Sequence, residues 1–387
     1  MRQSTVDSAM VVGPFSFFSP CRLRARVLLP SEFAGGSVRP LVLNNPLSRN
    51  CNLSQKDNPM INRRNFLAAA GAAGLAMHGQ SAMQAANTIG ERTVYELRQV
   101  HIGSEEQKQK YIPPLCSGEY AGSFAITEAN SGSDVASMKM TAKDCGDYWL
   151  LNGSKMWISG GHTSDVGLVY CKTDPSAGAK GISCFIVDFN ETTEGVQRIP
   201  IHKKVGMWPA PTSELVFEDA KIPKENLLGE LNRGFQLCMW QLNNTRMGCA
   251  TGAAALSSAA LEGSVQYANE RTQFGQPIGK FQMIQQQIAE MKLEDEAALL
   301  MVYRAAWLKE NKLPSQQQTS MAKLMSCNAA VHAANLAMKI YGSYGYSDEY
   351  PCGRWLRDAK QFETLEGTSN IHMGIVAGIE LGYSPNR

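Results

Sequence analysis

Apolar residues recur at helical spacing through the last third of the chain. Ile284, Ile288 and Met291 are separated by steps of four and three residues, and a second stripe of this kind begins at Met321. This spacing places apolar side chains on one face of a helix, where they pack against a core. The pattern predicts four helices, over residues 237–269, 281–311, 317–341 and 370–381. Four such helices are enough for a bundle, so residues 230–387 are interpreted as a C-terminal four-helix bundle domain.

Residues 121–229 carry a different pattern, in which short apolar runs are separated by glycine and proline. Apolar residues flank the pair Asn152-Gly153 on both sides, and Asn-Gly readily adopts the positive φ values of a tight type I′ turn. We therefore predict a hairpin that turns at this pair. Further β-type runs follow at residues 166–171, 182–189 and 214–217. Together these runs indicate a compact antiparallel β domain.

The N-terminal part of the chain does not continue either pattern. Residues 1–60 contain six prolines, and the spacing between them leaves no room for a long helix. We expect an irregular or disordered extension there. Residues 65–87 are alanine-rich and helical, and Gly103 to Tyr111 is typical of a loop leading into a short helix, so a helical segment is expected within residues 61–120.

Composition limits the classes of function. The 387 residues are 44% hydrophobic and 19% charged, with a net charge of +2, which is ordinary for a soluble globular protein. No long basic run favours nucleic-acid binding, and no stretch approaches the roughly 20 apolar residues that a membrane span requires. We expect a cytoplasmic protein, with the mitochondrial matrix as the alternative.

One segment superficially resembles a twin-arginine export signal. Arg63-Arg64 precedes Asn65-Phe66-Leu67 and an alanine-rich run. However, the arginine pair lies about sixty residues into the chain, His78 interrupts the apolar run, and no clean Ala-x-Ala cleavage site follows. We interpret this region instead as a mis-assigned start or a damaged N-terminal region.

Several kinds of site are absent from the sequence pattern. The ten cysteines and six histidines are scattered, with no Cys-x-x-Cys pair and no metal-ligand spacing. We therefore predict reduced thiols and no metal site. The chain also lacks the Gly-x-Ser-x-Gly elbow of serine hydrolases and the Gly-x-Gly-x-x-Gly signature of nicotinamide-binding folds.

Three polar segments could contact a cofactor, although each has an ordinary structural explanation. The turn Asn130–Asp134 could form an anion-binding nest, but most such turns bind nothing. Trp157 either fills the β-domain core or presents its ring to a cofactor. Arg271 lies where Gly275 and Pro277 separate two predicted helices, so it either belongs to a simple connection or binds a phosphate.

Glu366 lies just before the last predicted helix, for which Thr368 or Ser369 is a natural N-cap. Alone, such a carboxylate could cap the helix or be solvated. If it were catalytic, the helix dipole would lower its pKa and burial beside an apolar substrate would raise it. A base that removes a weakly acidic carbon-bound proton benefits from the higher pKa.

Taken together and in this order, these segments resemble the acyl-CoA dehydrogenase family, from about Gly103 to Gly382. The resemblance implies an α+β multidomain fold with a degenerate α-helical N-terminal part, a central antiparallel β-barrel and a C-terminal four-helix bundle. Residues 61–120 would be the remnant of the α-helical N-terminal domain. FAD would lie between barrel and bundle, in a homodimer or homotetramer. The residues at 361–366 and 381–387 are similar to those of short-chain and glutaryl-CoA dehydrogenases.

The resemblance also implies roles for individual residues. Glu366 would be the catalytic base, removing the α-proton of an acyl-CoA while a hydride leaves the β-carbon for flavin N5. Residues 241–246 offer no carboxylate at the position where some relatives carry the base. The implied cofactor contacts are Phe124, Ile126, Thr127, Gly132, Ser133, Trp157, Ile158, Ser159, Arg271, Phe274, Gln282, Thr368 and Asn370. The implied substrate contacts are Ser133, Thr245, Arg246 and Gly367.

The expected reaction is dehydrogenation of an acyl-CoA to the 2-enoyl-CoA, with electrons passed to an electron-transferring flavoprotein. Two alternatives stay open. The atypical N-terminal region favours a catalytically impaired relative that serves as a binding or assembly protein. An acyl-CoA oxidase would instead consume oxygen without an added acceptor.

Overall fold

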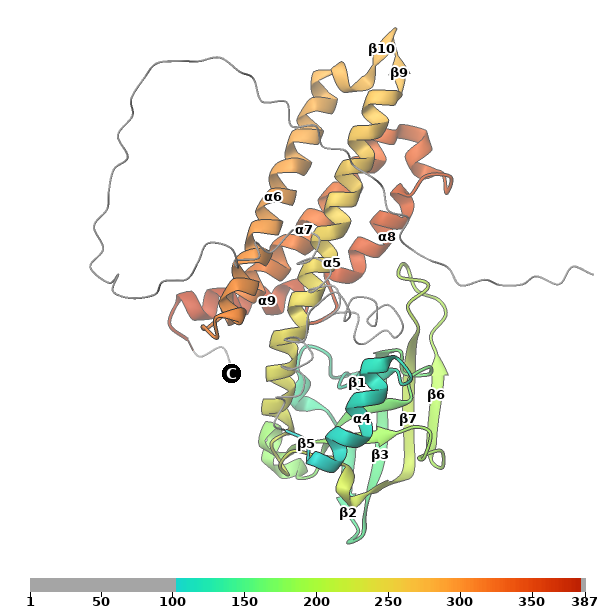
Figure 1. The fold of residues 1–387 in the computed structure, drawn as a ribbon, viewed down its shortest axis with the longest axis vertical. Helices are drawn as coiled ribbons and strands as arrows, with labels where there is room; N and C mark the ends of the chain where they lie inside the picture. The colour runs from blue at the N-terminus through green and yellow to red at the C-terminus, as the bar shows by residue number, and fades with distance from the viewer. Residues whose placement is uncertain (1–101, 384–387) are drawn as a thin grey trace, which may run out of the picture. The chain divides into compact units, whose positions relative to one another are not determined.

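The computed structural model describes residues 102–383 (Figure 1). The predicted extension over residues 1–60, the arginine pair and the alanine-rich stretch lie outside the described residues. The division of the chain into domains at residues 60, 120 and 229 therefore stays a prediction. Within residues 102–383, no helix is long and apolar enough to cross a membrane.

The short helix predicted after Gly103 is confirmed as α4 (Glu105–Ser117). Ser104 caps it, because its hydroxyl accepts a hydrogen bond from the Gln107 N–H while the Gln107 side chain accepts one from the Ser104 N–H. Gln107 also donates to the backbone oxygens of Glu225 and Leu227, which fixes α4 against the β region.

One sheet contains eight strands, in the order β6-β7-β3-β2-β4-β5-β8, with β1 beside β4. Its strands are β1 (Gly122–Ala125), β2 (Thr141–Asp144), β3 (Tyr148–Ser159), β4 (Val166–Lys172), β5 (Ile182–Asp188), β6 (Val196–Pro200), β7 (Thr212–Pro223) and β8 (Leu227–Leu228). Most neighbours are antiparallel, as expected, but β4 pairs in parallel with both β1 and β2. Among the described residues β6 and β8 do not pair with each other, so the expected closed β-barrel is not found.

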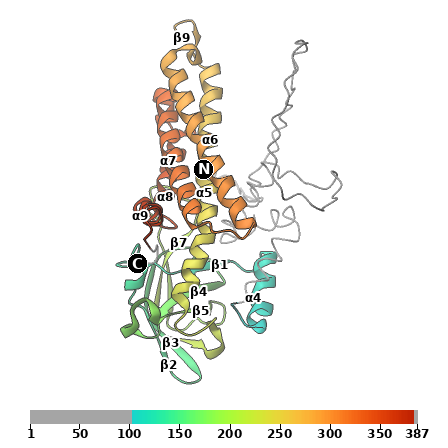
Figure 2. The same ribbon diagram turned by 90° about the vertical axis from the view of Figure 1, so that its left-hand side faces the viewer.

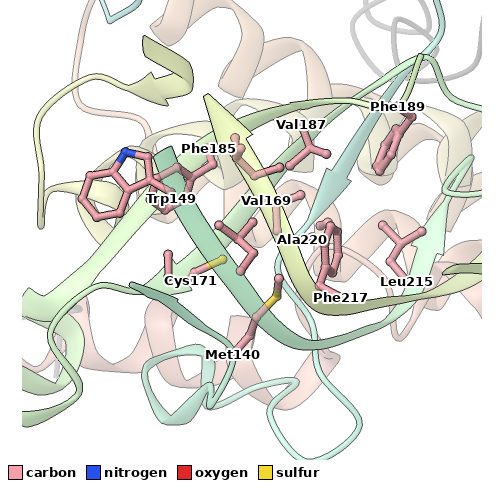
Figure 3. Packing of buried hydrophobic residues seen from close by; sticks show 14 of the residues in the cluster. Met140, Trp149, Val169, Cys171, Phe185, Val187, Phe189, Leu215, Phe217 and Ala220 are labelled. Carbon is pink, nitrogen blue, oxygen red and sulfur yellow. The ribbon is translucent and has the colours of Figure 1, made fainter. Parts of the chain in front are cut away.

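The sheet surrounds a hydrophobic core. Side chains from six of its strands form one buried cluster, which Figure 3 shows with Trp149, Val169, Phe185 and Phe217 among the labelled residues. The rings of Trp149 and Phe185 lie 5.2 Å apart. Burying each large apolar side chain contributes roughly 1.5–3 kcal/mol. Because strands from both halves of the sheet share this core, the sheet is curved although it does not close.

The hairpin predicted at Asn152-Gly153 is wrong, because β3 runs straight through both residues. The chain turns earlier, at 145–147, between the paired residues Asp144 and Trp149. Asn152 instead bonds to Asp219 on β7 through its side chain. Gly153, at φ 133, lies at a register shift, where a Cβ would come within 2.8 Å of the Met140 Cα. The glycine is thus required by a bulge and a close backbone approach.

All four predicted helices are present, with ends that differ by a few residues. Helices α5, α6 and α7 pack side by side (Figure 2), and α9 contacts α7. A fifth helix, α8, was not predicted; it is short, and its apolar residues Trp355, Leu356 and Ala359 pack against the neighbouring helices. The helices are α5 (Gly234–Glu270), α6 (Gln282–Glu310), α7 (Gln316–Tyr341), α8 (Cys352–Phe362) and α9 (Ser369–Glu380).

Short elements connect these segments. A two-stranded hairpin joins α5 to α6 and consists of β9 (Thr272–Gln273) and β10 (Gln276–Pro277). Short 3₁₀ segments are η1 (Val135–Ser137), η2 (Pro175–Gly181, with a kink at Gly178), η3 (Lys224–Asn226), η4 (Ile278–Lys280) and η5 (Gly342–Tyr346).

Candidate active site

Glu366 lies in the loop between α8 and α9. Thr368 is the N-cap of α9, as predicted, with its hydroxyl accepting a hydrogen bond from the Ile371 N–H. Glu366 and Gly367 both have positive φ, at 56° and 97°. The left-handed region is favourable for glycine but costs about 1–3 kcal/mol for a residue with a side chain, and such strain is common at functional sites.

The carboxylate of Glu366 is turned toward α5. Its Oε2 accepts a hydrogen bond of 2.6 Å from the Thr245 hydroxyl. Burial raises the pKa of Glu366, and the Thr245 hydroxyl, Arg246 and Lys323 lower it only in part. The pKa of Glu366 therefore lies above the ordinary range for a glutamate, which makes the ionised side chain a stronger base.

The backbone of the loop is held by three buried side chains. Arg246 donates through Nε to the main-chain carbonyl oxygen of Glu366 at 3.1 Å, and His372 Nε2 lies 3.2 Å from the same carbonyl oxygen. Lys323 donates to the Gly367 oxygen at 2.7 Å. Burial lowers the pKa of His372 to about 4, so the ring is neutral and must carry its proton on Nε2 to donate to a carbonyl.

Sequence reasoning missed Lys323 and His372. Lys323 lies on a predicted helix with no polar motif around it, and only the packing of α7 against the loop brings it to Gly367. His372 could have been noticed, since it lies in the first turn of the helix that follows Glu366. Of the implied substrate contacts, Thr245, Arg246 and Gly367 do lie beside Glu366.

The first two cofactor segments lie side by side although about thirty residues separate them. The Met156 N–H donates to the Thr127 oxygen at 2.8 Å. One residue away in each segment, the fully buried Lys155 forms an ion pair of 2.8 Å with Glu128 and also donates to the Ile126 oxygen. The structure thus brings the 124–134 and 155–159 segments together through a buried ion pair.

The side chains of these segments face different surroundings. Trp157 is 59% exposed and has a positive φ of 64°, so it does not fill the core. Gly132 and Ser133 are exposed, whereas Ile126 and Ile158 are buried. Phe124 packs edge-on against Tyr170, with ring centroids 5.3 Å apart, and Ser159 is partly exposed.

Arg271, Phe274 and Gln282 do not join this site within one chain. Arg271 lies 25 residues beyond Arg246 along α5, which corresponds to roughly 38 Å at about 1.5 Å per residue. Phe274 is 94% exposed at the turn between β9 and β10, and Gln282 is exposed at the start of α6. Asn370 is exposed in the first turn of α9, next to Thr368.

Comparison with known proteins agrees with this geometry. The family model for the acyl-CoA dehydrogenase middle domain matches residues 123–220, and the model for the C-terminal domain matches residues 232–379. The chain is 45% identical over 281 residues to a glutaryl-CoA dehydrogenase of Desulfococcus multivorans, covering 72% of each. It is 42% identical over 279 residues to the caffeyl-CoA reductase–Etf complex subunit CarC of Acetobacterium woodii, covering 72% of this chain and 73% of that one.

Among solved structures, a glutaryl-CoA dehydrogenase in complex with glutaryl-CoA superposes with a TM-score of 0.72 and 38% identity, covering 84% of this chain and 87% of that chain. Fold and comparisons together define a flavin-dependent oxidoreductase that acts on a CH–CH group. The chain belongs to the acyl-CoA dehydrogenase family.

The residues around Trp157 fit the FAD that this family binds. A flavin ring needs an accessible planar surface and backbone groups free to bond to it. The indole of Trp157 is accessible, and a Cβ built on Gly132 meets no atom within 4 Å, so the neighbouring turn borders open space.

Proposed function

We propose that this protein oxidises a short-chain or dicarboxylyl acyl-CoA to the 2-enoyl-CoA, with Glu366 as the base, and that it passes the electrons to an electron-transferring flavoprotein. The observation that carries the proposal is the position of Glu366. It is a carboxylate with a raised pKa, held by a side-chain hydrogen bond in a strained loop. The substrate class and the acceptor are supported by the names of the relatives.

Glu366 would take the α-proton on Oε1. The Thr245 hydroxyl bonds to Oε2, and within residues 102–383 no group bonds to Oε1, so this oxygen is free to accept the proton. The Thr245 bond also fixes the direction of the carboxylate. Such positioning contributes to the rate because the proton transfer needs a defined approach of base and carbon.

The negative charge that develops on the thioester oxygen also needs a donor. In the described part of the chain the Glu366 N–H donates to no other group, and it would bond to this oxygen as one half of an oxyanion hole. The buried cations Arg246 and Lys323 lie beside the same loop and favour added negative charge there.

FAD, when bound, accepts the hydrogen that leaves the β-carbon with its two electrons. Thr127, Ser133, Trp157 and Ser159 would hold the ring in one subunit. Because Arg271 and Phe274 lie too far along α5 to reach the same site, they would contact the cofactor of a second subunit. We therefore propose that the active unit is at least a homodimer, and a homotetramer in the manner typical of the family.

The test is an anaerobic titration of the purified yellow protein with butyryl-CoA and glutaryl-CoA. Bleaching of the flavin absorbance is expected with at least one of them. Glu366→Gln should retain FAD and abolish bleaching, since an amide cannot accept the proton. Glu363→Gln is the matched control, because Glu363 lies three residues earlier and its carboxylate, within residues 102–383, pairs only with Lys360. Retained turnover in Glu366→Gln would refute the role of the base.

Two further outcomes identify the alternatives. Colourless protein that takes up no FAD would favour a binding or assembly protein. Oxygen consumption at full rate without an added acceptor would favour an oxidase. Reduction of a purified electron-transferring flavoprotein is expected for a dehydrogenase.

A further inference from the structure

Two buried cations beside the Glu366 loop have no carboxylate partner. Arg246 is 7% exposed and Lys323 is fully buried. Within residues 102–383 neither forms an ion pair within 4 Å, whereas Lys155, equally buried, pairs with Glu128 at 2.8 Å. Burial of a charge costs several kcal/mol unless nearby groups compensate for it. The burial of Lys323 therefore needs a compensating interaction other than an ordinary ion pair.

The partner of Lys323 is the backbone of the catalytic loop. Its ammonium donates to the Gly367 oxygen at 2.7 Å. Within residues 102–383, α7 contributes no other hydrogen bond to residues 363–368. The preceding carbonyl, of Glu366, accepts from Arg246 and His372. Two successive carbonyls in a left-handed stretch are thus fixed by donors from three helices, which offsets the local backbone strain.

We propose that Lys323 is a positioning residue for the base, which anchors the Gly367 carbonyl and supplies the buried positive charge that allows Glu366 to ionise. This inference rests on the proposed role of Glu366. The interaction is electrostatic as well as geometric, because the Lys323 charge lowers the pKa of Glu366, against the larger effect of burial. His372, which is neutral, contributes only a hydrogen bond.

Other ionisable groups face the same loop and are part of its charge balance. They come from each helix that packs there, namely Cys238, Arg246 and Cys249 on α5, Lys323 and Cys327 on α7, Glu363 at the end of α8 and His372 on α9. Arg246 and Lys323 are the cations among them. Arg246 already stands next to Thr245 in the proposed substrate site, so Lys323 is the cation that can be altered without changing a residue assigned to substrate contact, although its ammonium bonds to the Gly367 oxygen.

The test compares Lys323→Met, Lys323→Arg and the matched control Ser326→Ala. Ser326 is buried on the same helix, and its hydroxyl forms no hydrogen bond with any residue from 102 to 383. For Lys323→Met we expect retained FAD, a nearly unchanged KM, and a kcat lower by roughly 10- to 100-fold, the range that misplacement of a catalytic group produces. The acid limb of kcat/KM against pH should move to higher pH, because the ionised Glu366 has lost a nearby cation.

Lys323→Arg should restore the position of the acid limb of the kcat/KM profile and most of kcat. Ser326→Ala should change neither the acid limb nor kcat. A Lys323→Met enzyme with the wild-type limb and kcat would overturn the proposal. So would a Lys323→Arg enzyme that is no better than Lys323→Met, since arginine keeps both the charge and the donors.

A second measurement needs no turnover and is therefore independent of the proposed reaction. Thermal unfolding at pH 7 of Lys323→Met, Glu366→Gln and the double variant forms a double-mutant cycle. Loss of Lys323 should lower Tm less in the Glu366→Gln background, where no carboxylate charge needs balancing. An equal decrease in Tm in both backgrounds would contradict the role of Lys323 as a counter-charge to Glu366. Should Lys323→Met alone fail to fold, a folded double variant supports the proposal and an unfolded one overturns it.

Discussion

Thr245→Val removes the hydrogen bond that holds the Glu366 carboxylate and leaves a side chain of the same shape. The hydroxyl donates to Glu366 Oε2 at 2.6 Å, a short charge-assisted contact. Valine cannot donate, so the ionised form of Glu366 loses its closest partner while the protonated form loses less. The pKa of Glu366, already raised by burial, should therefore rise further.

The size of the effect follows from the strength of such bonds. A hydrogen bond to a charged group contributes about 1.5–3 kcal/mol, and a shift of one pKa unit corresponds to about 1.4 kcal/mol. Arg246 and Lys323 remain in place and continue to favour the ionised form. We expect the acid limb of kcat/KM to move up by about one to two pH units, with the plateau at high pH lowered less than the rate near neutrality.

The measurement is the rate of flavin reduction by substrate from about pH 5 to about pH 9. This range spans neutrality, where a general base is most effective. Thr251→Val is the control, because Thr251 is a buried threonine of the same helix whose hydroxyl donates to the Met247 carbonyl instead. An acid limb that stays in place in Thr245→Val while kcat falls evenly at every pH would refute the argument. In that case Thr245 would act on substrate placement and not on the ionisation of Glu366.

Two further predictions concern stability. Burial raises the folded-state pKa of Glu366 above its unfolded value, so the contribution of Glu366 to stability is favourable at low pH and is lost as pH rises through the folded pKa. Glu366→Gln should therefore raise Tm at about pH 8 and change it little near about pH 4. Differential scanning calorimetry that shows the reverse order would contradict this sign. Lys155→Met leaves Glu128 buried without its cation and should lower the free energy of unfolding by about 3–5 kcal/mol, with loss of FAD retention. Chemical denaturation of the double variant Glu128→Gln/Lys155→Met should show part of that free energy recovered. A decrease below about 1 kcal/mol in the single variant would show that water reaches the ion pair.

The local patterns in the sequence predicted most elements because those patterns have local causes. The four long helices follow from apolar residues at steps of three and four, and the cap of α9 follows from Thr368. The hairpin prediction at Asn152-Gly153 was wrong because it considered only the local turn propensity, which is overridden by pairing between β3 and β7. Helix α8 was missed because its helicity depends on packing of Trp355, Leu356 and Ala359 against neighbouring helices.

For the site, the sequence by itself determined Glu366 as the candidate base, because its order relative to the other motifs resembles one family of enzymes. It also placed Thr245 and Arg246 near that base. Only the tertiary structure decided how the carboxylate is held: α5 brings Thr245, α7 brings Lys323 and α9 brings His372 to two residues of one loop. These contacts join residues separated by up to 121 positions, and burial, which sets the charge state of Glu366, exists only once the helices have packed.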